Sequence, residues 1–98
     1  MSQIKVLIAD DHTLFRRGIA SALANQAELE VVGEATDGLE AIAKAKELIP
    51  DVILMDLNMP NCSGLEATQA LQSEMPNVKI LVLTVSDSEA DLFAAVKY

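Results

Sequence analysis

The chain has 98 residues, of which 51% are hydrophobic, so it can bury one modest core and is expected to form one domain over residues 1–98. Its 15 acidic and 7 basic side chains give a formal net charge of -8, which argues against direct binding to nucleic acid or to an anionic membrane. The single cysteine, Cys62, and the lack of a signal-like segment at the start predict a reducing, cytoplasmic setting.

The first quarter of the chain predicts a strand and then a helix. Ile4 to Ala9 is an apolar run rich in β-branched residues, which is typical of a strand covered on both faces. From Asp10 to about Asn25, apolar residues recur about every four positions, which predicts a helix that buries one stripe. The residues expected on that stripe are Leu14/Phe15, Gly18/Ile19 and Ala22/Leu23.

The same alternation continues through the middle of the chain. Glu30 to Ala35 predicts a second strand, and Asp37 with Glu40 three positions later predicts the start of a second helix. Pro50-Asp51 breaks that helix, and Val52 to Met55 then predicts a buried strand.

The last third of the chain repeats the alternation once more. Ser63 to Glu66 has capping-box spacing and opens a third helix that runs to about Glu74. Lys79 to Thr84 predicts a fourth strand, and Ser86 to Glu89 predicts the start of a fourth helix. Strands that alternate with helices across short connections indicate an α/β fold with a doubly wound parallel sheet. A flavodoxin-like strand order of 2-1-3-4 is expected.

Acidic side chains collect where ligands bind in such a sheet, at the carboxyl ends of the strands. Asp10 and Asp11 follow the first strand and Asp56 follows the third, which a flavodoxin-like order places side by side. Converging carboxylates stay ionised together only if a cation neutralises them, and oxygen-only ligands favour Mg2+ with phosphate oxygens as further ligands. Asp56 is then placed to attack a phosphorus centre, and the hydroxyl of Thr84 is placed to donate a hydrogen bond to a phosphoryl oxygen.

Three segments carry a resemblance to a known family. They are Ile8-Ala9-Asp10-Asp11-His12, Asp56-Leu57-Asn58-Met59-Pro60 with Gly64 following, and Leu83-Thr84. Together they resemble the receiver domain of bacterial response regulators. Further segments resemble the subfamily whose regulators carry a LuxR-type helix-turn-helix output domain. These are Arg17-Gly18-Ile19, Gly33 to Gly38 and Gly64 to Thr68.

The resemblance implies a role for each site residue. Asp56 would be the phosphoacceptor for a sensor histidine kinase, and Asp10 and Asp11 would hold Mg2+ directly or through water. The backbone carbonyl of Asn58 would complete the metal site, and Thr84 would be the switch hydroxyl. An output domain outside these residues would then control transcription.

The same resemblance to receiver domains predicts that the domain is truncated after the fourth helix. The family's fifth strand and fifth helix have no counterpart here, and neither Lys97 nor Tyr98 is assigned the roles of the lysine and aromatic residue on that strand. The predicted strand from Lys79 to Thr84 would then be an open edge. Self-association, or another chain that covers this edge, is expected.

Two alternatives remain open, and two residues are assigned no role. Asp56-Leu57-Asn58 is distantly similar to the nucleophile motif of haloacid dehalogenase-type phosphatases, but we do not expect an enzyme. A phosphate-independent interaction module is the other alternative. His12 is expected to be an exposed early helix residue without a catalytic role, and Cys62 an inert thiol.

Overall fold

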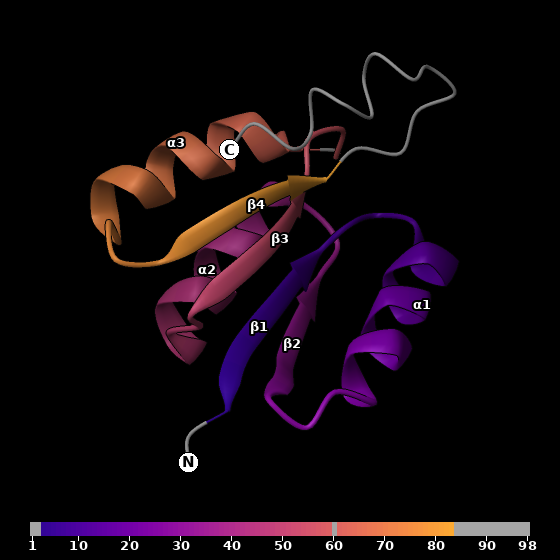
Figure 1. Cartoon of the computed structure of the whole chain (residues 1–98). Helices are drawn as coiled ribbons and strands as arrows, with labels where there is room; N and C mark the ends of the chain where they lie inside the picture. The colour runs from indigo at the N-terminus through magenta and orange to yellow at the C-terminus, as the bar shows by residue number, and fades with distance from the viewer. Residues whose placement is uncertain (1–2, 60, 84–98) are drawn as a thin grey trace.

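The computed structural model describes residues 3–59 and 61–83, and strands and helices alternate along them (Figure 1). The elements are β1 (Ile4–Ala9), α1 (Thr13–Ala24), β2 (Leu29–Ala35), α2 (Gly38–Leu48), β3 (Val52–Asp56), α3 (Gly64–Glu74) and β4 (Lys79–Leu83). The alternation predicted from the sequence is therefore confirmed for these elements. The predicted helix that starts near Ser86 lies outside the described residues, as do Thr84, Lys97 and Tyr98.

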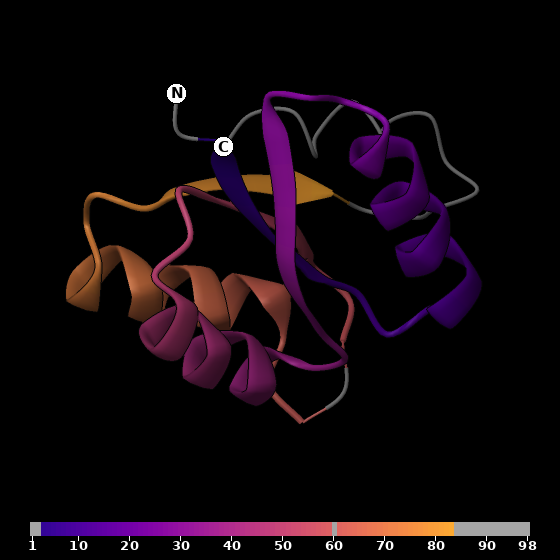
Figure 2. The ribbon, with the colours of Figure 1, turned by 90° about the horizontal axis from the view of Figure 1, so that it is seen from below.

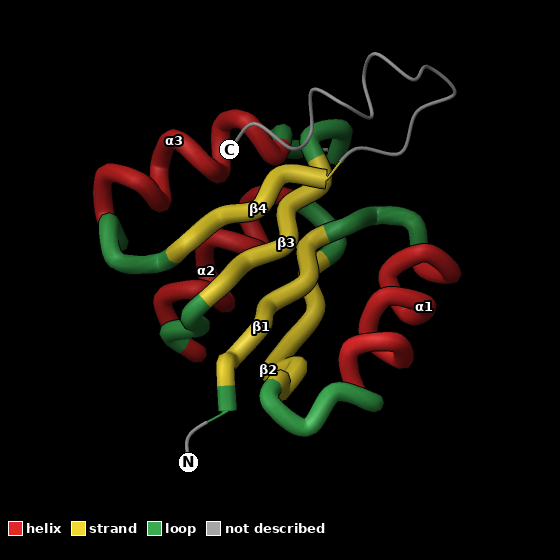
Figure 3. The backbone as a smooth tube through the Cα atoms, viewed as in Figure 1, coloured by secondary structure: helices red, strands yellow, loops and turns green. Residues whose placement is uncertain are grey.

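The strands form one parallel sheet in the order β2-β1-β3-β4, and this confirms the predicted flavodoxin-like order. Figure 3 shows the strands side by side, with the connecting loops at the two ends of the sheet. In the register of β1 and β3, Val6 pairs with Val52 and Ala9 pairs with Met55. The register between β3 and β4 ends with Asp56 opposite Leu83.

Helices cover the two faces of the sheet unequally among the described residues. Helix α1 lies on one face, and α2 and α3 lie together on the other (Figure 2). The main core lies between the sheet and the α2–α3 layer. Its buried members are Leu7, Ala9, Ala35, Ala41, Ala45, Ile53, Met55, Met59, Ala67 and Leu71.

The predicted buried stripe of α1 is partly wrong. Leu14 is 89% exposed and Phe15 is 40% exposed, whereas Arg16 is buried at 7% exposure. Gly18 and Ala22 are also exposed, and Ile19 and Leu23 lie partly buried as expected. The inward face of α1 is therefore rotated toward Arg16, because the guanidinium has polar partners below the helix that satisfy it.

The predicted starts of α2 and α3 are confirmed by their capping contacts. The side chain of Asp37 accepts a hydrogen bond from the amide of Glu40 at 2.7 Å. Ser63 and Glu66 form a capping box, in which each side chain accepts a hydrogen bond from the other residue's amide. Such caps satisfy the first free amides of a helix and fix where it begins. None of the described helices is long and apolar enough to cross a membrane.

Candidate phosphoacceptor and metal site

Two carboxylates lie next to each other because their strands are neighbours. Ala9 pairs with Met55, so the residues that follow them, Asp10 and Asp56, emerge together at the carboxyl end of the sheet. Both are almost completely buried, with Asp10 1% and Asp56 2% exposed. One oxygen of each, Oδ2, is buried without a hydrogen-bond partner among the described residues.

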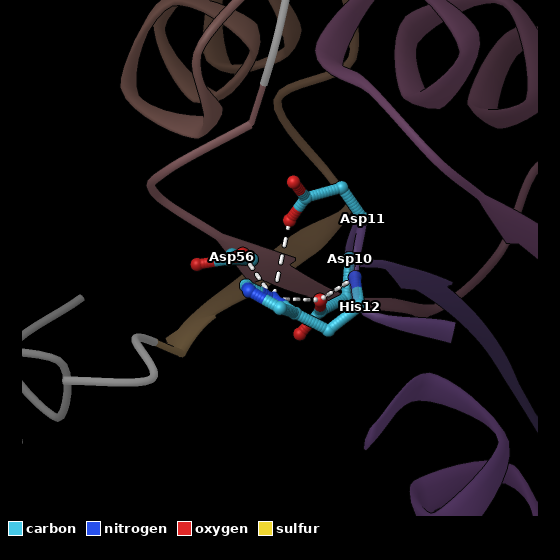
Figure 4. A group of neighbouring side chains, drawn as sticks. All are labelled: Asp10, Asp11, His12 and Asp56. Carbon is cyan, nitrogen blue, oxygen red and sulfur yellow. Dashed lines mark hydrogen bonds and ion pairs between the residues drawn. The ribbon is translucent and has the colours of Figure 1, made fainter. Parts of the chain in front are cut away.

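Asp11 and His12 complete the group at the start of α1 (Figure 4). The Nδ1 atom of His12 lies 3.0 Å from Oδ1 of Asp10, 3.2 Å from Oδ1 of Asp11 and 3.9 Å from Oδ2 of Asp56. We call Asp10, Asp11 and Asp56 the acid cluster. Its three acids and His12 can each offer one ligand atom such that all lie within 4.8 Å of one another.

The electrostatics of the acid cluster favour a bound cation. Burial, aided by the charges of Asp10 and Asp11 and opposed by a hydrogen bond from the amide of Asn58, raises the pKa of Asp56 from 3.8 to about 6. The hydrogen bond to Asp10 and the charge of Asp11 raise the pKa of His12. A divalent cation would neutralise the converging charges and occupy the oxygens that lack partners. The carboxylate ligands suit Mg2+, which prefers oxygen.

Arg16 anchors the backbone that presents Asp10. Its Nη1 donates a hydrogen bond to the carbonyl oxygen of Asp10 at 2.7 Å, and its Nε donates to Oε1 of Glu34 at 2.7 Å. Lys44 of α2 donates a hydrogen bond to the carbonyl oxygen of Glu34. The buried guanidinium thus ties α1 and β2 to the chain segment that carries the acid cluster.

A close backbone contact fixes the segment after Asp56. The amide of Gly64 donates to the carbonyl of Leu57 at 3.0 Å, and a Cβ at position 64 would lie 1.9 Å from the carbonyl oxygen of Asp56. Only glycine allows this approach. Gly38, the first residue of α2, makes a similar backbone contact: its amide donates to the carbonyl oxygen of Cys62 at 3.0 Å. The loop after β3 is therefore clamped between the starts of α2 and α3.

The family follows from comparison with known proteins. The model of the response regulator receiver domain matches residues 6–98. The chain belongs to this family. Receiver domains of two-component systems are in general signalling modules rather than catalysts; they bind Mg2+ at an acidic site and interact with histidine kinases.

Named relatives agree with this assignment. The chain is 49% identical over 92 residues to the response regulator protein VraR of Staphylococcus aureus, covering 94% of this chain and 44% of VraR. The signal receiver domain of NarL from Mycobacterium tuberculosis superposes with a TM-score of 0.85 at 34% identity, covering 99% of this chain and 78% of that one. RcsB from Salmonella enterica, in a structure described as bound to promoter rprA with the phosphomimetic BeF3-, superposes with a TM-score of 0.81 at 32% identity. The match covers 94% of this chain and 77% of the RcsB chain.

This receiver brings together the three acids that the sequence singled out, Asp10, Asp11 and Asp56. Asn58 lies two residues after Asp56, and its amide donates to Oδ1 of Asp56 at 3.2 Å. A metal contact from the carbonyl of Asn58 stays a prediction. So does the switch role of Thr84, which lies outside the described residues.

Sequence reasoning missed two residues of the site. The predicted exposure of His12 is confirmed, since its side chain is 54% exposed; the sequence did not predict that its ring nitrogen would also face all three acids. The signal that could have found it is its place directly after Asp10-Asp11, where the chain must turn into α1. Arg16 gave no such signal, because its partners come from β2 and from a backbone carbonyl.

Proposed function

We propose that this chain is the phosphoacceptor receiver domain of a two-component response regulator, in which Asp56 takes a phosphoryl group from a histidine kinase with Mg2+ as cofactor. The observation that carries the proposal is the acid cluster at the carboxyl end of the sheet. It joins two almost fully buried carboxylates, each with an oxygen that lacks a partner among the described residues, to a third acid at their edge. Such a group is costly to keep unless it binds a cation.

The residues of the cluster would divide the work of metal binding and reaction. Asp10 and Asp11 hold Mg2+ directly or through water, together with Asp56 and the backbone carbonyl of Asn58. When bound, Mg2+ supplies the positive charge that offsets the phosphoryl oxygens. Arg16 keeps Asp10 in place through its hydrogen bond to the carbonyl of that residue.

Asp56 is the nucleophile in this proposal. The amide of Asn58 orients its carboxylate by holding Oδ1 at 3.2 Å. A carboxylate oxygen attacks the phosphorus of the kinase's phosphohistidine, a phosphorus–oxygen bond forms, and the phosphorus–nitrogen bond breaks. The electron pair returns to the imidazole nitrogen of the kinase, which then takes up a proton. The product is an aspartyl phosphate.

The signal would pass on through parts of the protein beyond the acid cluster. The hydroxyl of Thr84, which follows the last described residue of β4, would donate a hydrogen bond to a phosphoryl oxygen. The chain spans less than half the length of the curated VraR relatives, covering 44% of them. An output domain outside these residues would then control transcription, in line with the promoter that the RcsB structure is described as holding.

An interaction surface belongs to the same proposal. Within the described residues, 3–59 and 61–83, strand β4 is an edge strand of the sheet. Its residue Leu81 is 41% exposed. A second copy of the chain, or another chain, would cover this edge. Light scattering should therefore give a mass above that of the monomer at micromolar concentration, and a strictly monomeric chain would contradict this part of the proposal.

Intact mass spectrometry tests the phosphoacceptor role. The chain is incubated with acetyl phosphate and Mg2+, beside the same mixture with a chelator and beside Asp56→Asn. A matched control is Asp51→Asn, which alters an exposed aspartate at the opposite end of β3. We expect one phosphoryl adduct in the wild type and in the control, and none in Asp56→Asn or with chelator. A folded chain that gains no adduct would favour a phosphate-independent interaction module instead.

A further inference from the structure

His12 adds a nitrogen donor to a cluster that is otherwise made of oxygen. It is the only histidine of the chain. It occupies the N-cap position of α1, yet its side chain makes no capping hydrogen bond and turns instead toward the acids (Figure 4). Its amide donates to Oδ1 of Asp10 at 2.7 Å, so backbone and ring are both held against the same carboxylate.

The spacing of the donor atoms fits one metal ion. One ligand atom from each of Asp10, Asp11, His12 and Asp56 lies within 4.8 Å of all the others. Metal–ligand bonds of about 2.0–2.2 Å require ligand atoms about 3–4 Å apart, so only small side-chain adjustments are needed. Oδ2 of Asp56, which is buried and lacks a hydrogen-bond partner among the described residues, lies 3.9 Å from the ring nitrogen. The cluster therefore already presents an unused ligand beside the imidazole.

The donor set decides which cation benefits from the imidazole. Mg2+ prefers oxygen ligands, so a ring nitrogen adds little to its affinity. Zn2+, Co2+ and Ni2+ bind imidazole well, and they bind sites with both nitrogen and oxygen ligands more tightly than Mg2+ does. Four protein ligands also complete the tetrahedral shell that Zn2+ prefers. A site closed in this way leaves no position for a phosphoryl oxygen and engages the carboxylate of Asp56.

We infer that His12 makes the acid cluster a mixed nitrogen and oxygen site for a transition-metal dication of the Zn2+ or Co2+ kind, which competes with Mg2+ and blocks phosphorylation of Asp56. The binding half of this inference stands on the donor geometry alone. The inhibitory half rests on the proposed function. If both halves hold, the receiver would respond to the free concentration of such a cation as well as to its kinase.

Cobalt absorption tests the binding half on the full chain. Four-coordinate Co2+ absorbs strongly in the visible range, and the variant for comparison is His12→Asn, since asparagine is a favoured N-cap residue and should leave the start of α1 intact. We expect a visible spectrum that titrates to one Co2+ per chain and is displaced by Zn2+. In His12→Asn, affinity for Co2+ should fall at least about tenfold, while affinity for Mg2+ changes less than about threefold.

Two outcomes would overturn the binding half. One is equal Co2+ affinity in the wild type, in His12→Asn and in His12→Ala. The other is a near-ultraviolet band of the cobalt–thiolate kind, which would place the ion on Cys62, outside the acid cluster. Circular dichroism of His12→Asn confirms that the variant is folded, and His12→Ala provides a second variant if asparagine itself acts as a ligand.

The inhibitory half is measured as the free Zn2+ concentration that halves the rate of adduct formation from acetyl phosphate and Mg2+, normalised within each variant. This concentration should rise at least about tenfold in His12→Asn. Unchanged sensitivity to Zn2+ would overturn the inhibitory half. If Mg2+ supports no phosphorylation in the wild type but the cobalt spectrum still depends on His12, the proposed function fails and the metal site stands.

Discussion

Replacing Asp56 with asparagine should stabilise the fold in metal-free buffer above pH 6. Burial, aided by the charges of Asp10 and Asp11, raises the pKa of Asp56 from 3.8 to about 6. At neutral pH Asp56 is ionised in both states, but ionisation costs more free energy in the folded chain than in the unfolded chain. At about 1.36 kcal/mol per pH unit, this lowers the free energy of unfolding by about 3 kcal/mol, which the variant should largely regain.

The sign of the effect depends on pH. Between pH 3.8 and 6 the folded chain binds more protons at Asp56 than the unfolded chain, so wild-type stability falls as the pH rises through this window. Asp56→Asn lacks this titration. Its advantage should be small at pH 3.8 and full above pH 6. Saturating Mg2+ should narrow the advantage, because the cation stabilises the ionised wild type and loses one ligand in the variant.

Urea unfolding followed by circular dichroism, in chelator and across this pH range, measures the difference. The control is Glu47→Gln, which removes one negative charge from an exposed position on α2 and should change the free energy of unfolding by less than about 0.5 kcal/mol. The reasoning would be refuted if Asp56→Asn were no more stable than the wild type at neutral pH. An equal gain in the control would refute it too, since net charge alone would then explain the result.

Three further perturbations test the framework around the site. Gly64→Ala should destabilise the chain by at least about 2 kcal/mol in urea unfolding and reduce phosphorylation, because its Cβ would lie 1.9 Å from the carbonyl oxygen of Asp56; an unchanged midpoint would contradict the close contact. Arg16→Met should cost about 2–3 kcal/mol and weaken Mg2+ binding, since it removes the donors to Glu34 and to the carbonyl of Asp10; calorimetry should show both losses together. Mg2+ at about 100 times its dissociation constant should stabilise the wild type by about 2.7 kcal/mol, and a melting temperature that ignores Mg2+ would argue against a metal site.

Much of the fold could be predicted because it rests on local signals. Apolar runs rich in β-branched residues marked the strands, and the capping residues Asp37 and Ser63 marked the starts of α2 and α3. The acid cluster could be predicted for a topological reason. In a parallel sheet with β1 beside β3, residues that follow paired positions must meet at one edge, and Asp10 and Asp56 do so.

The inward face of α1 could not be predicted from periodicity. The apolar pattern correctly placed Ile19 and Leu23 toward the sheet, but it also placed Leu14 there, which is exposed, and it missed Arg16, which is buried. Burial of Arg16 is stabilised by Glu34 and by a backbone carbonyl, which are distant in sequence. The orientation of the His12 ring could not be predicted for a related reason: only the turn from β1 into α1 directs the ring toward the acids.

Peptide mapping after borohydride reduction tests the central claim most directly. The reagent converts an aspartyl phosphate into homoserine and leaves unmodified aspartate unchanged, so it reports the position of the phosphoryl group. After incubation with acetyl phosphate and Mg2+, the account predicts homoserine at position 56 and at no other aspartate. Reduction at Asp10 or Asp11, or at no residue of a folded chain that contains Mg2+, would contradict it.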